Sequence, residues 1–249
     1  MLASINHNGK TYTIDFSKPI DISIPLRAGA NNVNAWYAPP VKIEPVVMGD
    51  WIGDVKQGGS VNFRNVCLNP HAHGTHTECV GHISKEDFSL NTCLAKFFFG
   101  AQLITVKPES IGEDLVISKE QIQSKLNGNT EEAIILRTLP NGIDKCTRQY
   151  SNSNPPFIHA DAMNFLVEQN VKHLLIDLPS VDKEKDDGVL AAHHAFWNYP
   201  EQTRTDATIT ELFFADDSIA DGFYFLNLQI TSLENDASPS KPVLYKPLS

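Results

Sequence analysis

The sequence contains no long hydrophobic run. Across its 249 residues, no stretch approaches the roughly 20 apolar residues that a membrane-spanning helix requires, so we expect no membrane association. Positive charge is also scarce, because 20 lysines and arginines stand against 30 aspartates and glutamates, for a net charge of −10. A general nucleic-acid-binding protein would carry a basic surface, so no nucleic-acid partner is expected. The first residues lack the basic and apolar segments of a secretory signal, which predicts a cytoplasmic protein.

Cysteine is scarce as well, and several catalytic motifs are missing. The four cysteines have no Cys-x-x-Cys spacing, so they predict free thiols in a reducing compartment rather than a cysteine zinc site. Cys79 fits a small buried residue better than a ligand or a nucleophile. The chain has neither a Gly-x-Ser-x-Gly nucleophile motif nor a phosphate-binding glycine-rich loop. A serine hydrolase or a nucleotide-dependent enzyme is therefore not expected.

Histidine, by contrast, is concentrated in one stretch. Residues 69–82 read Asn-Pro-His-Ala-His-Gly-Thr-His-Thr-Glu-Cys-Val-Gly-His and hold four of the nine histidines. Imidazole nitrogens and carboxylate oxygens are the usual ligands of zinc and similar divalent cations. His76 and Glu78 are two residues apart, so an extended segment would point both side chains to one face. Glu78 and His82 are four apart, so a helical turn would instead bring those two together. The stretch predicts a divalent-cation site.

The segment Gly74-Thr75-His76-x-Glu78-x-x-x-His82 resembles the signature of the cyclase family, which includes bacterial kynurenine formamidases and isatin hydrolases. The family pattern is His-x-Gly-Thr-His-x-Asp-x-Pro-x-His. In this sequence glutamate replaces the aspartate and valine replaces the proline. The resemblance implies that His76 and Glu78 are metal ligands.

The first histidine of the family pattern has no counterpart at strict spacing, because Ala72 occupies that position. His71 and His73 flank it, and either would supply the ligand after a shift of one residue. We favour His71, because an inserted residue before Gly74 would restore its direction. Both histidines stay candidates on the sequence alone.

The same resemblance implies a second cluster of ligands, a histidine on a helix followed by a glutamate on the next strand. His193 and Glu211 match this pair, and His193 is preferred to His194 by its register with the family pattern. Adjacent helical residues point about 100° apart, so both histidines would not face one cation. Asp182 matches a family position near the pocket. The candidate metal ligands are therefore His71, His73, His76, Glu78, His193 and Glu211.

These residues together indicate a metal-dependent hydrolase that acts on a small amide, formamide, lactam or ester. A bound cation would lower the pKa of water and polarise the carbonyl group, and His82 is the candidate general acid–base. Nitrogen-rich ligation favours zinc, while manganese remains compatible. The alternative is a non-catalytic metal-binding or sensing relative that has lost activity. The resemblance also implies a small-molecule substrate and a homodimer or homotetramer.

Length and patterning predict one domain, residues 1–249, of the mixed α/β class. The resemblance implies the swivelling β/β/α fold, with a central mixed sheet and flanking helices. A hairpin over 2–16 is expected to turn at Asn8-Gly9, and Ser118 is expected to cap a helix. Strand, helix and strand in succession predict a β-α-β unit. The expected helices are 119–127, 160–170 and 188–197, and the expected strands of the second half are 132–137, 171–178, 208–213 and 223–232.

The remaining segments are expected to be less regular. Residues 26–41 predict a loop or lid over the pocket, in which Trp36 could stack on a substrate. Phe97–Phe99 is expected in the core. The tail, with prolines at 239, 242 and 247, is expected to extend along the surface.

Overall fold

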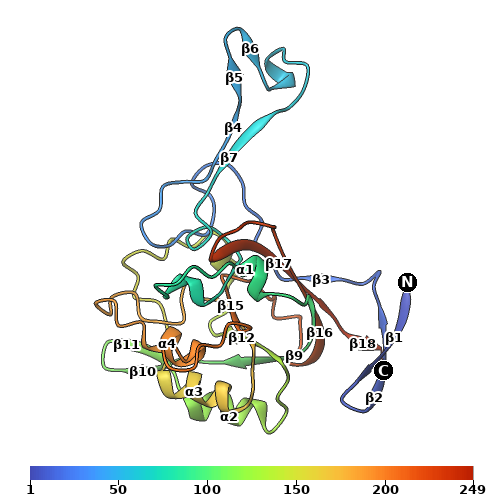
Figure 1. The fold of residues 1–249 in the computed structure, drawn as a ribbon, viewed down its shortest axis with the longest axis vertical. Helices are drawn as coiled ribbons and strands as arrows, with labels where there is room; N and C mark the ends of the chain where they lie inside the picture. The colour runs from blue at the N-terminus through green and yellow to red at the C-terminus, as the bar shows by residue number, and fades with distance from the viewer. Residues whose placement is uncertain (249) are drawn as a thin grey trace.

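Eight strands form the central sheet of the computed structural model, which describes residues 1–248 (Figure 1). Their order is β16-β9-β12-β14-β15-β8-β17-β3, and β16 also pairs with β17, so seven strands close into a barrel-like sheet. The bounds are β3 Ile20–Asp21, β8 His76–Glu78, β9 Phe98–Val106, β12 Ala133–Thr138, β14 His173–Ile176, β15 Thr208–Glu211, β16 Gly222–Ile230 and β17 Ala237–Tyr245.

The strands in the middle of this sheet are buried on both faces. β9, β12, β14 and β15 run parallel, and all six residues of β12 are buried. Ile134 and Leu136 pack toward the helices, whereas Ala133 and Ile135 belong to a second apolar cluster with residues of β9, β16 and β17. This two-sided burial explains why the sequence of β12 is almost uniformly apolar rather than alternating.

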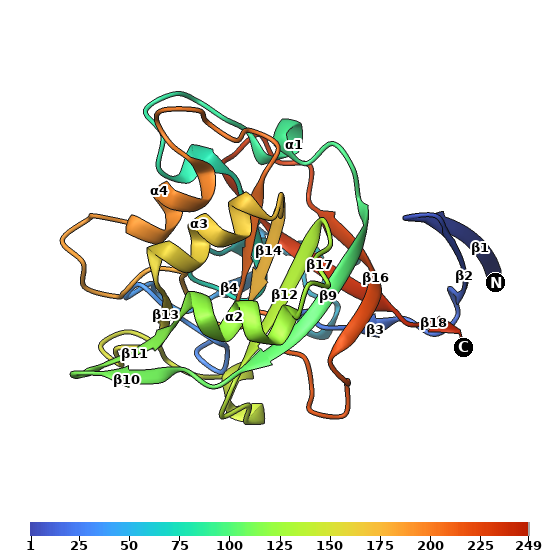
Figure 2. The ribbon, with the colours of Figure 1, turned by 90° about the horizontal axis from the view of Figure 1, so that it is seen from below.

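Three helices cover one face of the sheet (Figure 2). They are α2 (Lys119–Leu126), α3 (Ala160–Glu168) and α4 (Ala191–Trp197), while the short α1 (Leu90–Cys93) lies apart from them. Their apolar side chains, including those of Phe196 and Trp197, are buried with those of the sheet. Within residues 1–248, no helix is both long enough and apolar enough to cross a membrane.

Smaller sheets surround this core. The hairpin of β1 (Leu2–His7) and β2 (Lys10–Asp15) pairs with β18 (Pro247–Leu248), which brings the two ends of the described chain together. A second small sheet joins β10 (Glu109–Ile111), β11 (Asp114–Ile117) and β13 (Phe157–Ile158). An arm, residues 42–67, projects from the body (Figure 1) and contains β4 (Lys42–Pro45), β5 (Val47–Met48), β6 (Trp51–Ile52) and β7 (Arg64–Cys67).

The structure confirms the mixed α/β class and most of the predicted elements. Asn8 and Gly9 both have positive φ, 47° and 73°, as a type I′ hairpin turn requires. Ser118 and Gln121 form a reciprocal capping box at the start of α2. α3 lies between the parallel strands β12 and β14, which confirms the β-α-β unit.

Two predictions are wrong. The tail is not a surface segment, because residues 237–245 form β17, which pairs with β16, β8 and β3. Proline lacks a donor, but its carbonyl still accepts, and Pro242 accepts a hydrogen bond from the backbone of Ile22. The second error concerns the phenylalanines, because Phe97 and Phe98 are exposed and Phe99 alone is in the core.

Candidate metal centre and active site

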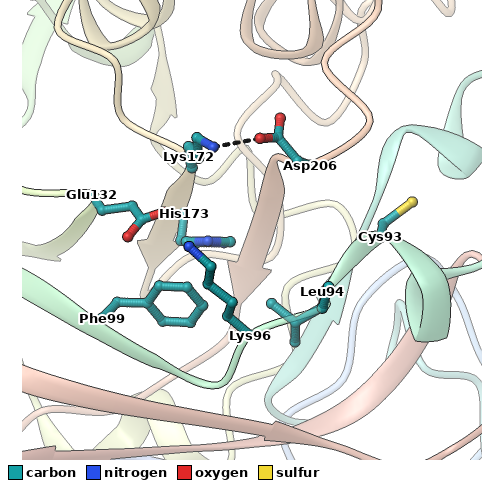
Figure 3. A pocket seen from close by; sticks show the side chains of 9 residues that line it. Cys93, Leu94, Lys96, Phe99, Glu132, Lys172, His173 and Asp206 are labelled. Atoms are coloured by element: carbon teal, nitrogen blue, oxygen red, sulfur yellow. Dashed lines mark hydrogen bonds and ion pairs between the residues drawn. The ribbon is translucent and has the colours of Figure 1, made fainter.

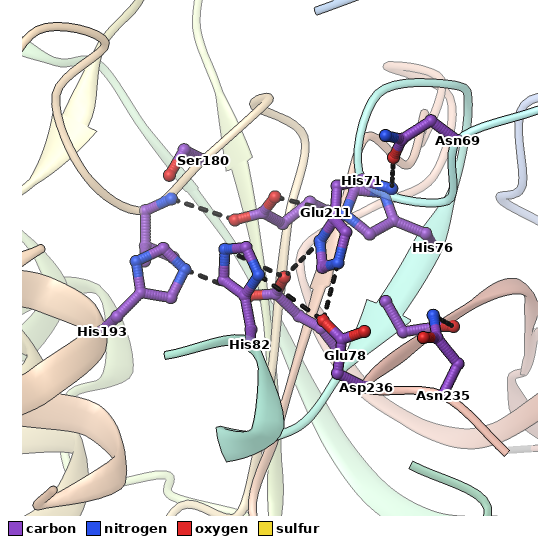
Figure 4. Close-up of polar contacts among 12 residues, drawn as sticks. Asn69, His71, His76, Glu78, His82, Ser180, His193, Glu211, Asn235 and Asp236 are labelled. Atoms are coloured by element: carbon purple, nitrogen blue, oxygen red, sulfur yellow. Dashed lines mark hydrogen bonds and ion pairs between the residues drawn. The ribbon is translucent and has the colours of Figure 1, made fainter. Parts of the chain in front are cut away.

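The strand β8 positions the centre of the site. Its three residues are buried, and it pairs with β15 on one side and β17 on the other. His76 therefore lies opposite Glu211, and Glu78 lies opposite Ala237. The short 3-10 turn η2 (Val80–His82) follows and turns His82 back toward Glu78. Residues from several distant segments meet at this strand (Figure 4).

The Glu78 carboxylate lies between two histidines. Its Oε1 is 3.1 Å from Nε2 of His193, and its Oε2 is 3.0 Å from Nδ1 of His71. The same Oε2 is 3.9 Å from Nε2 of His82. Each oxygen of Glu78 thus faces a different imidazole, which is an arrangement suited to cations on one or both sides of the carboxylate.

Each of these histidines also contacts an aspartate through its other ring nitrogen. Nδ1 of His193 is 2.6 Å from Oδ2 of Asp182, and Nε2 of His71 is 2.8 Å from Oδ2 of Asp236. Asp182 also accepts the backbone N–H groups of Ala192 and His193 at the start of α4, so its position is fixed. A carboxylate can only accept, so each ring donates from one nitrogen to its aspartate and, in the cation-free protein, from the other to Glu78.

His76 and Glu211 form the remaining part of the cluster. Nε2 of His76 is 3.4 Å from Oε2 of Glu211 and, although buried, has no hydrogen-bond partner. Oε1 of Glu211 accepts the backbone N–H of Val181. A buried polar atom without a partner costs free energy, and a cation between these two groups would satisfy it. The donors present therefore fit a divalent cation.

Of the predicted metal ligands, the structure brings together all except His73. Three groups of side chains have ligand atoms within 4.8 Å of one another: His71, His76 and Glu78; Glu78, His82 and His193; and His71, His82 and Asp236.

His73 and His194 point away from this cluster. Nδ1 of His73 accepts the backbone N–H of Asn69, and its Nε2 contacts the carbonyl of Pro39. His194 contacts the carbonyl of Tyr199. The sequence left two choices open, His71 or His73 and His193 or His194. The structure places His71 and His193 beside Glu78.

Burial and ion pairing set the charges of the cluster. Burial alone would lower the pKa of His193, but hydrogen bonds to Asp182 and Glu78 outweigh it and raise that pKa to about 10. Contacts with Asp236 and Glu78 raise the pKa of His71 to about 10 in the same way, against its burial. Burial favours a raised pKa for Glu78, but the positive charges of the surrounding histidines hold it well below its ordinary value. Protons thus occupy positions that a cation would take, so cation binding would release them.

A cavity of about 360 Å³ opens over the cluster. Its polar lining includes His71, His82, His193 and Glu211, and its apolar lining includes Trp36 and Leu190. The loop that carries Trp36 therefore does lie at the pocket, as predicted. This volume suits a small organic molecule with an apolar face.

A second cavity, of about 90 Å³, lies at the opposite end of the parallel strands (Figure 3). His173 forms part of its wall, with its Nδ1 2.9 Å from the hydroxyl of Thr208, the first residue of β15. Glu211 is at the other end of the same strand. Burial lowers the pKa of His173 to about 3, so this histidine is neutral. The smaller cavity shares no lining residue with the one over the metal cluster.

Comparison with known proteins assigns the family. The model of the family described as “Putative cyclase” matches residues 20–183, which is more than half of the chain, so this protein belongs to that family. Kynurenine formamidase from Bacillus cereus is 29% identical over 232 residues, covering 92% of this chain and 97% of that protein. Kynurenine formamidase from Bacillus thuringiensis is 29% identical over 235 residues, with the same coverage of 92% and 97%.

Solved structures share the fold. One described as a potential metal-dependent hydrolase with cyclase activity has a TM-score of 0.67 at 17% identity, covering 93% of this chain and 99% of the other. An isatin hydrolase bound to the product analogue thioisatinate has a TM-score of 0.66 at 15% identity, covering 93% of each chain. At these identities the likeness concerns the fold alone, and it confirms the cyclase-type architecture.

The raised pKa values of His71 and His193 predict how the stability of the cation-free protein depends on pH. Both rise from an ordinary 6.5 to about 10, so the folded state binds more protons than the unfolded chain between these values. The stabilisation is complete below pH 6.5 and is lost as the pH rises toward 10. Urea unfolding of chelator-treated protein should therefore give a free energy of unfolding that falls across this window. A value that stays constant or rises would contradict the assignment.

Proposed function

We propose that this protein is a metal-dependent hydrolase that cleaves a small amide, formamide, lactam or ester with an activated water. The observation that carries the proposal is the buried Glu78 carboxylate, which faces two histidines that line a cavity, His71 and His193, each with an aspartate on its other ring nitrogen. The family membership and the kynurenine formamidase relatives support an amidohydrolase that acts on a non-peptide C–N bond.

The residues that would hold the cation fall on two sides of Glu78. His71 and His76 lie on one side, His193 lies on the other, and Glu211 comes within 3.4 Å of His76. A bound divalent cation supplies Lewis acidity, which makes water acidic enough to lose a proton near neutral pH and polarises a carbonyl group. Because the set contains more imidazole than a manganese site usually has, we favour zinc over manganese.

His82 has the position of a proton carrier. It is about a third exposed at the cavity, and its Nε2 lies on the side of Glu78, whereas its Nδ1 lies 3.6 Å from Asp236. Its ring stacks on that of His71, with the centroids 4.2 Å apart. No tight hydrogen bond occupies Nε2, so this nitrogen can take a proton from water and return it to the leaving nitrogen or oxygen.

The cavity walls indicate the kind of substrate. Trp36 and Leu190 provide apolar surface in the cavity that the polar cluster also lines. An aromatic or similarly flat group would pack on this surface and place its carbonyl near Glu78 and His82. The relatives named kynurenine formamidase favour an aryl formamide within this class.

The alternative, a non-catalytic metal-binding or sensing relative, is not favoured. A protein that only bound a cation would have no need for His82 beside an open cavity, or for the apolar side chains of Trp36 and Leu190 in that cavity. The replacement of the family aspartate by Glu78 keeps the carboxylate, and the structure brings it within contact of both histidines.

We further expect a homodimer or homotetramer in the cytoplasm. The projecting arm carries exposed apolar side chains, among them Val47, Met48 and Phe63, which a second copy of the chain would cover. The four cysteines are free thiols, which fits a reducing compartment.

The proposed function is tested by metal content and turnover together. Protein loaded with zinc should hold the metal stoichiometrically and hydrolyse at least one member of a panel of N-formylkynurenine, isatin and simple esters. Removal of the metal by a chelator should abolish turnover, and added zinc should restore it. Stoichiometric metal without turnover on the whole panel would favour the non-catalytic alternative. Full activity after verified metal removal would exclude a metal-dependent mechanism.

Replacement of His82 tests the proton carrier. His82→Ala should lower kcat about 10²- to 10⁴-fold, the usual contribution of a general acid–base, while the zinc content stays the same. His194→Ala is the matched control, because His194 follows His193 in the sequence but its ring faces the Tyr199 carbonyl instead of the cluster. Steady-state kinetics and metal analysis of both variants provide the measurement. Unchanged kcat in His82→Ala would remove this residue from the mechanism.

A further inference from the structure

Asp236 is a residue of the site that no motif in the sequence indicates. It precedes β17, and its carboxylate contacts two functional histidines at once: Oδ2 is 2.8 Å from Nε2 of His71 and 3.6 Å from Nδ1 of His82. Figure 4 shows its side chain beneath these two rings. The contact with His71 joins residues that are 165 positions apart in the sequence.

The sheet fixes the position of Asp236. Ala237 lies opposite Glu78 in the pairing of β17 with β8, and the carbonyl of Asp236 accepts the backbone N–H of Cys79. The side-chain amide of Asn235 donates to the carbonyl of Ala237 and closes the preceding turn. The backbone of Asp236 is thus bonded to the residue after Glu78, and the next residue, Ala237, pairs with Glu78 itself, so the Asp236 carboxylate is held beside the cluster.

The contact determines which nitrogen of His71 is free. A carboxylate only accepts hydrogen bonds, so Nε2 of His71 carries the hydrogen that points to Asp236. In the neutral ring, Nδ1 then has its lone pair directed at Glu78, where a cation would bind. Without Asp236 the ring could rotate or change tautomer and lose this direction. The stacked ring of His82 is held from the same side.

We propose that Asp236 is a positioning residue that orients His71 for cation binding and His82 for proton transfer. It performs for His71 the function that Asp182 performs for His193, and it adds a link to the proton carrier. This inference rests on the proposed function, because it assumes a cation beside Glu78.

Three substitutions separate positioning from other roles. Asp236→Asn keeps an oxygen that accepts the His71 N–H, Asp236→Leu keeps the approximate size without an acceptor, and Asp236→Ala removes both. Glu234→Gln is the matched control, because Glu234 lies two residues away on the same loop and contacts Asn91, outside the cluster.

The first readout is zinc affinity, measured by competition with a chromophoric chelator and independent of activity. We expect Asp236→Ala and Asp236→Leu to weaken zinc binding about 10- to 100-fold, the usual effect of losing the partner behind a metal-binding histidine. Asp236→Asn should restore most of this loss, and Glu234→Gln should match the wild type. Thermal unfolding of the metal-free proteins checks that each variant folds. If Asp236→Ala does not fold, Asp236→Leu gives the comparison.

The second readout is the visible spectrum of the cobalt-substituted proteins, together with kcat and KM. The Ala and Leu variants should show an altered spectrum and a lowered kcat with little change in KM, and the Asn variant should resemble the wild type. Equal affinity in all variants would overturn the inference, as would an equal loss in Asn, Leu and Ala, which would make Asp236 a direct ligand. A wild type that binds no zinc would overturn the proposed function itself, and this inference with it.

Discussion

The structure depends on one buried carboxylate shared by two imidazoles. Glu78 has no contact with solvent, and each of its oxygens faces a different histidine. A buried charge is costly unless it is paired, so these histidines are required for Glu78 to remain ionised in the core. In the cation-free state protons supply the positive charge, and a divalent cation would supply it in their place.

The barrel-like sheet positions the side chains around Glu78. β8 is only three residues long, but it is paired on both sides, by β15 and β17. β15 brings Glu211, the residue before β17 is Asp236, and α4 brings His193 from the helical layer. The pairing of β8 with β15 and β17 therefore joins the second half of the chain to the histidine-rich segment. His76, Glu78 and Glu211 are placed by strand pairing and His193 by a helix, which favours a preorganised site.

Local sequence features predicted only part of this. The spacing of His76 and Glu78 is sufficient to predict that both side chains lie on one face, because alternate residues of a strand point to the same side. The resemblance to the cyclase family selected His193, while the choice between His71 and His73 required the fold of the preceding turn. Asp236 was missed because three prolines made the tail resemble a surface segment. Strand pairing between residues so distant in sequence leaves no local periodicity, so the contact of Asp236 with His71 had no signal in the sequence.

The central claim is that a divalent cation binds beside Glu78, and a crystal of zinc-loaded protein tests it most directly. Anomalous diffraction recorded on both sides of the zinc absorption edge should give one or two peaks in contact with Glu78. The peaks should lie among the imidazoles of His71, His76 and His193 and the carboxylate of Glu211. A map with no zinc peak within this cluster, and with these side chains turned apart, would contradict the account.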